Sequence, residues 1–141
     1  MKDTMPRTFP LTRENIPAIC VELLDADFYP HGLSPSENQV LILSGKKIYH
    51  RPGAALRIQL CGRRQTFVDW EFRIESVLDC QLFYDKYADR VNEHEIADVH
   101  LLSDNVLKIE THSGLVINVT VSELSGQLFI DDPVCPSGKR A

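Results

Sequence analysis

The sequence predicts an α+β fold, mainly an antiparallel β-sheet arranged as a meander, with one N-terminal helix packed on it. Apolar and polar residues alternate over several segments after residue 39, which is the period of half-buried strands. Helical spacing occurs in one segment near the N-terminus, and short turn-rich joints follow Leu102 and Thr111. A length of 141 residues, with 43% hydrophobic and 25% charged residues, indicates one domain over residues 1–141.

The first predicted elements are an arm, a helix and a loop. Residues 1–10 contain two prolines and little periodicity, so we expect an extended arm. A helix is predicted over residues 12–25, with Thr12 as its N-cap and apolar residues at helical spacing. Pro17 fits this helix only if it begins near Glu14 or later, because proline lacks an amide hydrogen. The following DADFYPHGLSPSEN is rich in turn formers and predicts a loop.

The next segments predict strands. QVLILS at 39–44 is a short apolar run, and Leu56, Ile58 and Leu60 alternate in the segment after it. The clearest strand lies within TFVDWEFRIESVL at 66–78, where apolar residues alternate with charged ones. Residues 79–97 lose this alternation, so we expect a loop or one irregular turn there.

Three strands in quick succession are predicted near the C-terminus. They are ADVHLLS, NVLKIETH and GLVINVTV, joined by short turns around residues 103–105 and 112–114 into a meander of two hairpins. A last strand is expected around Leu128–Ile130, stopped by Asp131, Asp132 and Pro133. Residues 133–141 are expected to be a loose tail.

Charge and cysteine usage restrict the function classes. Residues 45–73 carry +5, whereas residues 74–141 carry −7, and the whole chain carries −5. This balance disfavours nonspecific nucleic-acid binding, although the basic segment 46–64, with Tyr49 and His50, leaves a small nucleic-acid-binding protein as an alternative. The four cysteines form no CxxC pair, and the sequence has no signal-peptide pattern and no membrane-spanning apolar run, so a cytoplasmic protein with no membrane association is expected.

The stretch NEHEIADVH at 92–100 raises the question of a metal site. A zincin helix requires histidines at positions i and i+4, but the residue four after His94 is Asp98. On a strand, Asp98 and His100 would share a solvated polar face, which favours no metal and no cofactor. The alternative is a metal-dependent enzyme that uses His94, Asp98, His100 and His112. Because no nucleophile motif or phosphate loop is present either, the sequence disfavours an enzyme and predicts no catalytic residue.

WEFRIESVL followed by NVLKIETHSGLVINV resembles small β-rich bacterial immunity proteins of polymorphic toxin systems, over residues 66–121. The resemblance implies a stoichiometric inhibitor that masks the active site of a toxin enzyme through an acidic face. The predicted partner is therefore a protein, bound by a monomer or homodimer. The expected partner-binding residues are Asp79, Phe83, Tyr84, Asp85, Tyr87, Asp89, Glu93, Glu95 and Asp98.

Overall fold

The computed structural model describes residues 4–29, 34–48, 67–85 and 93–133. These residues contain one helix and nine strands. In chain order they are β1 (Thr4–Pro10), α1 (Ile16–Leu23), β2 (Asp27–Phe28), β3 (Leu41–Ile48), β4 (Phe67–Ile74), β5 (Val77–Phe83), β6 (His94–Ser103), β7 (Val106–Thr111), β8 (Val116–Val121) and β9 (Gly126–Pro133).

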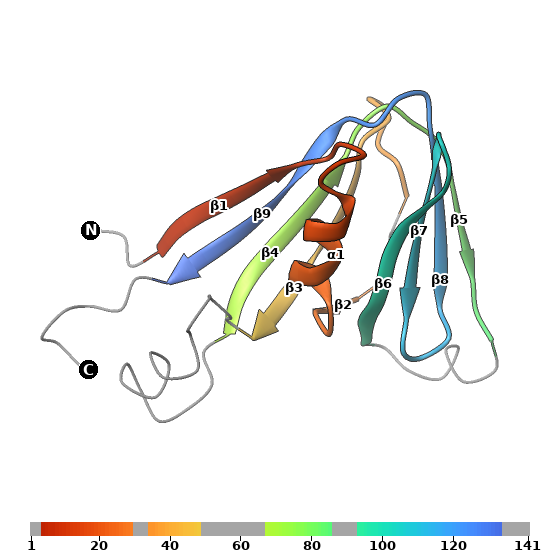
Figure 1. Ribbon diagram of the computed structural model, residues 1–141. Coiled ribbons are helices and arrows are strands. Elements are labelled where there is room, and N and C mark those ends of the chain that lie inside the picture. Colours follow the sequence, from red (N-terminus) through yellow and green to blue (C-terminus); the bar gives the residue numbers. More distant parts are fainter. Residues whose placement is uncertain (1–3, 30–33, 49–66, 86–92, 134–141) are drawn as a thin grey trace, which may run out of the picture.

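All nine strands belong to one antiparallel sheet, in the order β1-β9-β4-β3-β2-β6-β7-β8-β5. The sheet is sharply folded (Figure 1): β1, β9, β4 and β3 form one half, and β6, β7, β8 and β5 form the other. The helix lies in the space between the two halves. The predicted α+β class, with a mainly antiparallel sheet and one N-terminal helix, is confirmed.

Helix α1 begins one turn later than the sequence predicts. The Thr12 hydroxyl accepts a hydrogen bond from the Asn15 amide at 3.2 Å, so Thr12 organises the turn that precedes the helix. Pro17 stands in the first turn of α1, where its missing amide hydrogen costs no intrahelical bond. Ile19 and Leu23, one turn apart, are buried against the sheet.

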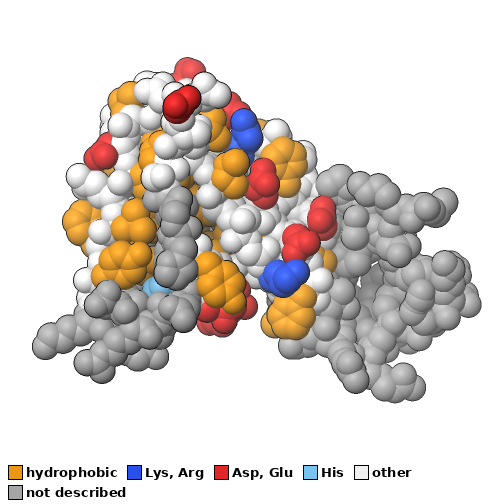
Figure 2. Space-filling model, turned by 180° about the vertical axis from the view of Figure 1, so that it is seen from behind, with side chains coloured by type: hydrophobic (Ala, Val, Ile, Leu, Met, Phe, Trp, Pro, Cys, Tyr) orange, Lys and Arg blue, Asp and Glu red, His pale blue; other side chains and the backbone are white. Residues whose placement is uncertain are grey.

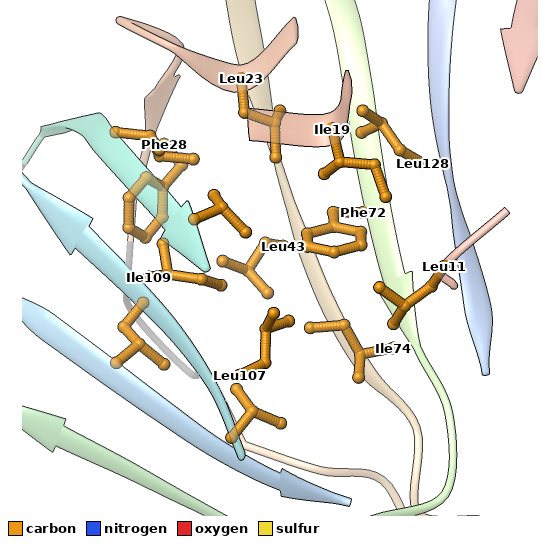
Figure 3. Close-up of a cluster of buried hydrophobic side chains, with 14 of the residues drawn as sticks. Leu11, Ile19, Leu23, Phe28, Leu43, Phe72, Ile74, Leu107, Ile109 and Leu128 are labelled. Carbon is orange, nitrogen blue, oxygen red and sulfur yellow. The ribbon is translucent and has the colours of Figure 1, made fainter. Parts of the chain in front are cut away.

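The hydrophobic core fills the fold of the sheet. Figure 3 shows Ile19 and Leu23 of α1 facing Leu43 and Phe72, while Leu107 and other side chains of the second half close the cluster from the opposite side. Strands β3, β4, β7 and β8 contribute alternate residues; β4, for example, buries Val68, Trp70, Phe72 and Ile74. The alternation visible in the sequence is therefore the alternation between the core and solvent.

A buried ion-pair cluster joins the helix to the first half of the sheet. The Lys47 ammonium, with 4% of the side chain exposed, lies 3.0 Å from the Glu22 carboxylate of α1. Arg7 of β1 approaches the same carboxylate at 3.3 Å. Glu22 therefore compensates a buried cation that would otherwise be costly.

The C-terminal half of the sheet follows the predicted meander. Strands β6, β7 and β8 are consecutive antiparallel neighbours, as expected. Gly114 in the β7–β8 turn has a φ of 96°, a conformation that glycine adopts without a steric penalty. The last predicted strand is also present, as β9, and pairs with both β1 and β4. Its expected stop at Asp131, Asp132 and Pro133 was wrong, because these residues continue β9 by pairing with β1.

Two segments differ from the sequence prediction. Residues 4–10 of the expected arm form β1, which pairs along its whole length with β9 at the edge of the sheet. Residues 79–83 and 94–97, expected in a loop, belong to β5 and β6. The prediction was wrong for residues 79–83 because β5 is an edge strand with one exposed face and a bulge at Leu78, which hides the period of two. In β6, the register shift between Ile96 and Asp98 interrupts the alternation.

Other predictions fall outside the residues that the structure describes. The expected strand at Leu56–Leu60 lies within the undescribed range 49–66. Pro133 ends β9, and the remainder of the expected tail, 134–141, is likewise outside. The expected loop after α1 contains the two-residue strand β2.

Candidate functional site

A groove of about 860 Å³ lies on the face of the sheet that α1 does not cover. Residues of β9, β4, β3 and β2, most of them pointing outward, line it, together with Tyr29 and Glu93 beside them. Figure 2 shows acidic and hydrophobic side chains gathered at this hollow between the two halves of the molecule. The lining residues are Asp27, Tyr29, Ser44, Gly45, Lys46, Phe67, Asp69, Trp70, Glu71, Glu93, Phe129 and Asp131.

The groove lies where the sheet folds, at its shortest strand. β2 has only two residues and, among the strands that the structure describes, it alone lies between β3 and β6. Gly45 of β3 allows β2 to come close, because a Cβ atom at position 45 would lie 1.7 Å from the Asp27 carbonyl oxygen. Gly45 is paired with Phe28 of β2 on one side and with Trp70 of β4 on the other. The rings of Phe28 and Trp70 meet edge to face, with their centroids 6.5 Å apart. Gly45 therefore positions the Asp27 side of the groove.

In the part of the chain that the structure describes, the groove carries five carboxylates and one ammonium group, from Asp27, Asp69, Glu71, Glu93, Asp131 and Lys46. Lys46 is the register partner of Asp27, but its ammonium pairs with Asp69 at 2.7 Å. Burial, followed by repulsion from Glu93 and Glu95, raises the pKa of Asp27 above its ordinary value. The groove is therefore an acidic site that a cation would stabilise.

Aromatic side chains stand beside these carboxylates. Tyr29 is 58% exposed and Phe67 is 55% exposed, and Phe129 is partly covered. The Tyr29 hydroxyl donates to Glu93 at 3.2 Å, and the negative charge of Glu93 raises the Tyr29 pKa. Trp70, which also lines the groove, is buried, and its indole Nε1 has no hydrogen-bond partner among the described residues. Carboxylates beside aromatic faces suit a guanidinium or ammonium group on an apolar stem.

The partner-binding residues predicted from the sequence occupy several places. Asp79 and Phe83 are on β5, followed by Tyr84 and Asp85, at the outer edge of the second half of the sheet. Glu93, Glu95 and Asp98 lie at or near β6, which β7 and β8 separate from β5. Tyr87 and Asp89 are outside the described residues. Of the described members of the predicted set, the groove includes only Glu93.

The remaining groove residues were not predicted as a site. Asp69 and Glu71 were visible in the sequence as the charged, solvent-facing row of a strand, and this was the available signal. Phe67 was expected in the core-facing apolar row of that strand, but it is 55% exposed and lies on the same face as Asp69 and Glu71. The pairing of β4 with β9, which brings Phe129 opposite Glu71, connects segments more than fifty residues apart. Local periodicity carries no information about such pairing.

The four residues of the alternative metal set lie at three separate places in the structure. Within the described ranges, no group of ligand atoms lying within 4.8 Å of one another contains all four of these residues. His94 is buried between the rings of Phe28 and Tyr84, and its Nδ1 contacts the Ser113 hydroxyl. His112 lies 2.8 Å from Asp25 on an exposed surface that includes Glu95.

Asp98 and His100 lie at the third place, on β6, and Glu110 lies beside them on the neighbouring strand β7. The His100 Nδ1 lies 2.6 Å from one Asp98 oxygen, and the Cys20 thiol donates to the other at 3.2 Å. Burial tends to raise the Asp98 pKa, but the hydrogen bonds from Cys20 and His100 outweigh it and lower the pKa. Burial, together with Asp98, raises the Cys20 pKa despite a hydrogen bond from the Val99 amide, so the thiol is protonated and is a poor nucleophile.

The basic segment behind the nucleic-acid alternative is only partly described. Lys47 points into the core and pairs with Glu22, so it is not part of a basic surface. Lys46 is exposed and pairs with Asp69. Residues 49–64 of the segment lie outside the described residues.

Comparison of the chain with protein-family models, with curated proteins and with solved structures found no match. Among the described residues, no helix has the length and apolar character needed to span a bilayer.

Proposed function

We propose that this chain is a protein-binding module, a cytoplasmic stoichiometric inhibitor of the immunity-protein type that covers a basic active site of a toxin enzyme. The observation that carries the proposal is the groove, where, among the described residues, five carboxylates and exposed aromatic rings surround a single lysine. The resemblance of residues 66–121 to immunity proteins supports the same function.

The chemistry of the groove favours a partner surface rich in arginine or lysine. An arginine inserted beside Tyr29 or Phe67 would bury its alkyl stem on a ring while its guanidinium meets the carboxylates. Such a cation would also relieve the repulsion between Asp27 and Glu93. Aromatic anchors in a desolvated centre supply most of the affinity in protein interfaces, whereas surrounding charges raise the association rate and select the partner.

An inhibitor requires no catalytic group of its own. Nucleases and other enzymes that act on anionic substrates have basic active sites, which an acidic surface can occupy in place of the substrate. The exposed β5 residues of the predicted acidic face, Asp79 and Phe83, lie on the other half of the sheet. We therefore assign the main docking role to the groove.

The test begins with co-expression of this protein and the product of its neighbouring gene, followed by copurification and calorimetric titration. We expect a 1:1 complex whose affinity falls steeply with salt. Glu71→Lys and Phe67→Ala should each weaken binding about tenfold or more, because hot-spot and charge-reversal changes cost at least roughly 1.4 kcal/mol. Glu123→Lys, an equal charge reversal at an exposed residue outside the groove, serves as the control.

Unchanged affinity in both groove variants would overturn the assignment of the groove. Failure to copurify any partner, in a genomic setting without a toxin gene, would remove the inhibitor function itself. The first outcome tests whether the groove is the binding site, and the second tests whether the protein is an inhibitor at all.

A metal-assisted enzyme is the second candidate, favoured by one observation. Ligand atoms of Asp98, His100 and Glu110 lie within 4.8 Å of one another on two adjacent strands. This candidate predicts stoichiometric zinc, manganese or iron in the purified protein, and loss of that metal in His100→Ala. Elemental analysis that finds no such metal would exclude it.

A further inference from the structure

The two edges of the sheet differ in their protection against pairing with another strand. β1 forms one edge and contains Pro6 and Pro10, which have no amide hydrogen to offer to an added strand. β5 forms the other edge, with the sequence VLDCQLF, and contains neither proline nor lysine. Exposed edges of this kind are templates for further strand pairing.

Apolar side chains accompany the open edge. Leu78 is 56% exposed, Phe83 is 50% exposed, and Tyr84, directly after the strand, is 47% exposed. Leu78 stands in the bulge of the β5–β8 pairing, where the register passes from Val77 directly to Asp79. No strand of the described residues pairs with the outer side of β5, so this edge offers main-chain hydrogen-bonding groups and apolar surface together.

We propose that β5 pairs with β5 of a second copy of this chain, antiparallel across a two-fold axis, so that the two sheets join into one. A two-fold rotation makes an edge strand antiparallel to its own copy, which continues the antiparallel order of this sheet. Antiparallel main-chain pairing satisfies the outward amide and carbonyl groups of both strands.

The sequence of β5 is compatible with self-pairing. When Cys80 faces the partner's Cys80, Leu78 faces the partner's Leu82, and Asp79 faces the partner's Gln81. Asp79 is the only charged residue of the strand, so no two like charges are directly opposite each other. A cross-strand aspartate–glutamine pair can hydrogen-bond, and leucine pairs bury apolar area.

This surface is independent of the proposed inhibitor function. The groove is lined by β9, β4 and β3 of the first half of the sheet, by β2 at the fold and by Glu93 just before β6, whereas β5 is the last strand of the second half. Self-association through β5 would therefore leave each copy's groove accessible. A dimer would present two grooves.

The test is sedimentation equilibrium of the full chain over a wide concentration range. We expect a mass that rises from 16.0 kDa towards twice that value. Leu78→Lys and Phe83→Lys should each weaken association about tenfold or more, because lysine on an edge strand opposes edge-to-edge pairing. Ile42→Lys, at a 43% exposed strand residue away from this edge, should associate as the unaltered protein does.

Hydrogen exchange provides a second readout that does not depend on substitutions. Amides of residues 77–83 should exchange more slowly as concentration rises, because dimer formation protects the edge. A 16.0 kDa mass at every concentration, or association with protection elsewhere and none in β5, would overturn the proposal. Equal weakening by Ile42→Lys would also overturn it.

Discussion

Gly45→Ala tests the account of how the groove is built. The added Cβ would lie 1.7 Å from the Asp27 carbonyl oxygen, whereas real Cβ atoms essentially never approach closer than 3.0 Å. β2 must therefore move away by at least 3.0 − 1.7 = 1.3 Å, which breaks its short ladder with β3. The same movement separates Phe28, which is 1% exposed, from Trp70.

The expected cost of Gly45→Ala is about 3 kcal/mol in the free energy of unfolding. Roughly 1 kcal/mol comes from each lost backbone hydrogen bond, and the remainder comes from partial loss of Phe28 packing. Urea unfolding measures the cost, and Ser44→Ala, at the exposed neighbouring position, should change stability by less than about 0.5 kcal/mol. If Gly45→Ala is as stable as Ser44→Ala, the close approach of β2 does not shape this part of the sheet.

Three further predictions concern ionisable groups. Glu22→Ala should cost about 3–5 kcal/mol in urea unfolding, since it leaves the Lys47 ammonium buried without its carboxylate; a loss below about 1 kcal/mol would contradict the buried pair. Asp27→Asn should stabilise the protein at pH 7, because the folded-state pKa of Asp27 is raised above 3.8 and the folded protein disfavours its charged form. This gain in stability should disappear as the pH falls through the raised pKa and below 3.8, where Asp27 is protonated in both the folded and the unfolded states. Stability curves at several pH values measure this, and a gain that persists in acid would exclude charge repulsion as the cause. Burial and the charge of Asp79 raise the pKa of Cys80 to about 11. Alkylation of Cys80 at pH 8, followed by mass spectrometry, should therefore be about 100-fold slower than that of a thiol of ordinary pKa. Alkylation at the ordinary rate would show that the thiol is accessible and ionised.

The sequence predicted the elements with the strongest periodicity. β4 and the β6–β8 meander follow from alternation, since each of these strands buries one face and exposes the other. The helix was predicted to begin too early, because a threonine such as Thr12 can organise the turn before a helix as well as cap the helix itself. β5 was missed because its bulge and exposed edge position remove the alternation.

The candidate site was predicted less well than the fold. Asp98 and His100 were correctly placed on a strand, but Cys20 and Glu110 became their neighbours through packing of α1 and pairing of β7. The groove combines side chains from β2, β3, β4 and β9 with Glu93, and no local pattern connects these segments. Lys47 shows the same limit: the sequence placed it in a basic segment, and the fold placed it in the core beside Glu22.

The sequence by itself determined the α+β class, the meander and the solvent-facing row of β4, because these depend on residues two to four positions apart. Only the tertiary structure decided that β1 and β9 complete the first half, that the sheet folds at β2, and that carboxylates and aromatic rings meet there. Strand pairing over long separations depends on the burial of the whole core, and a local period cannot encode it.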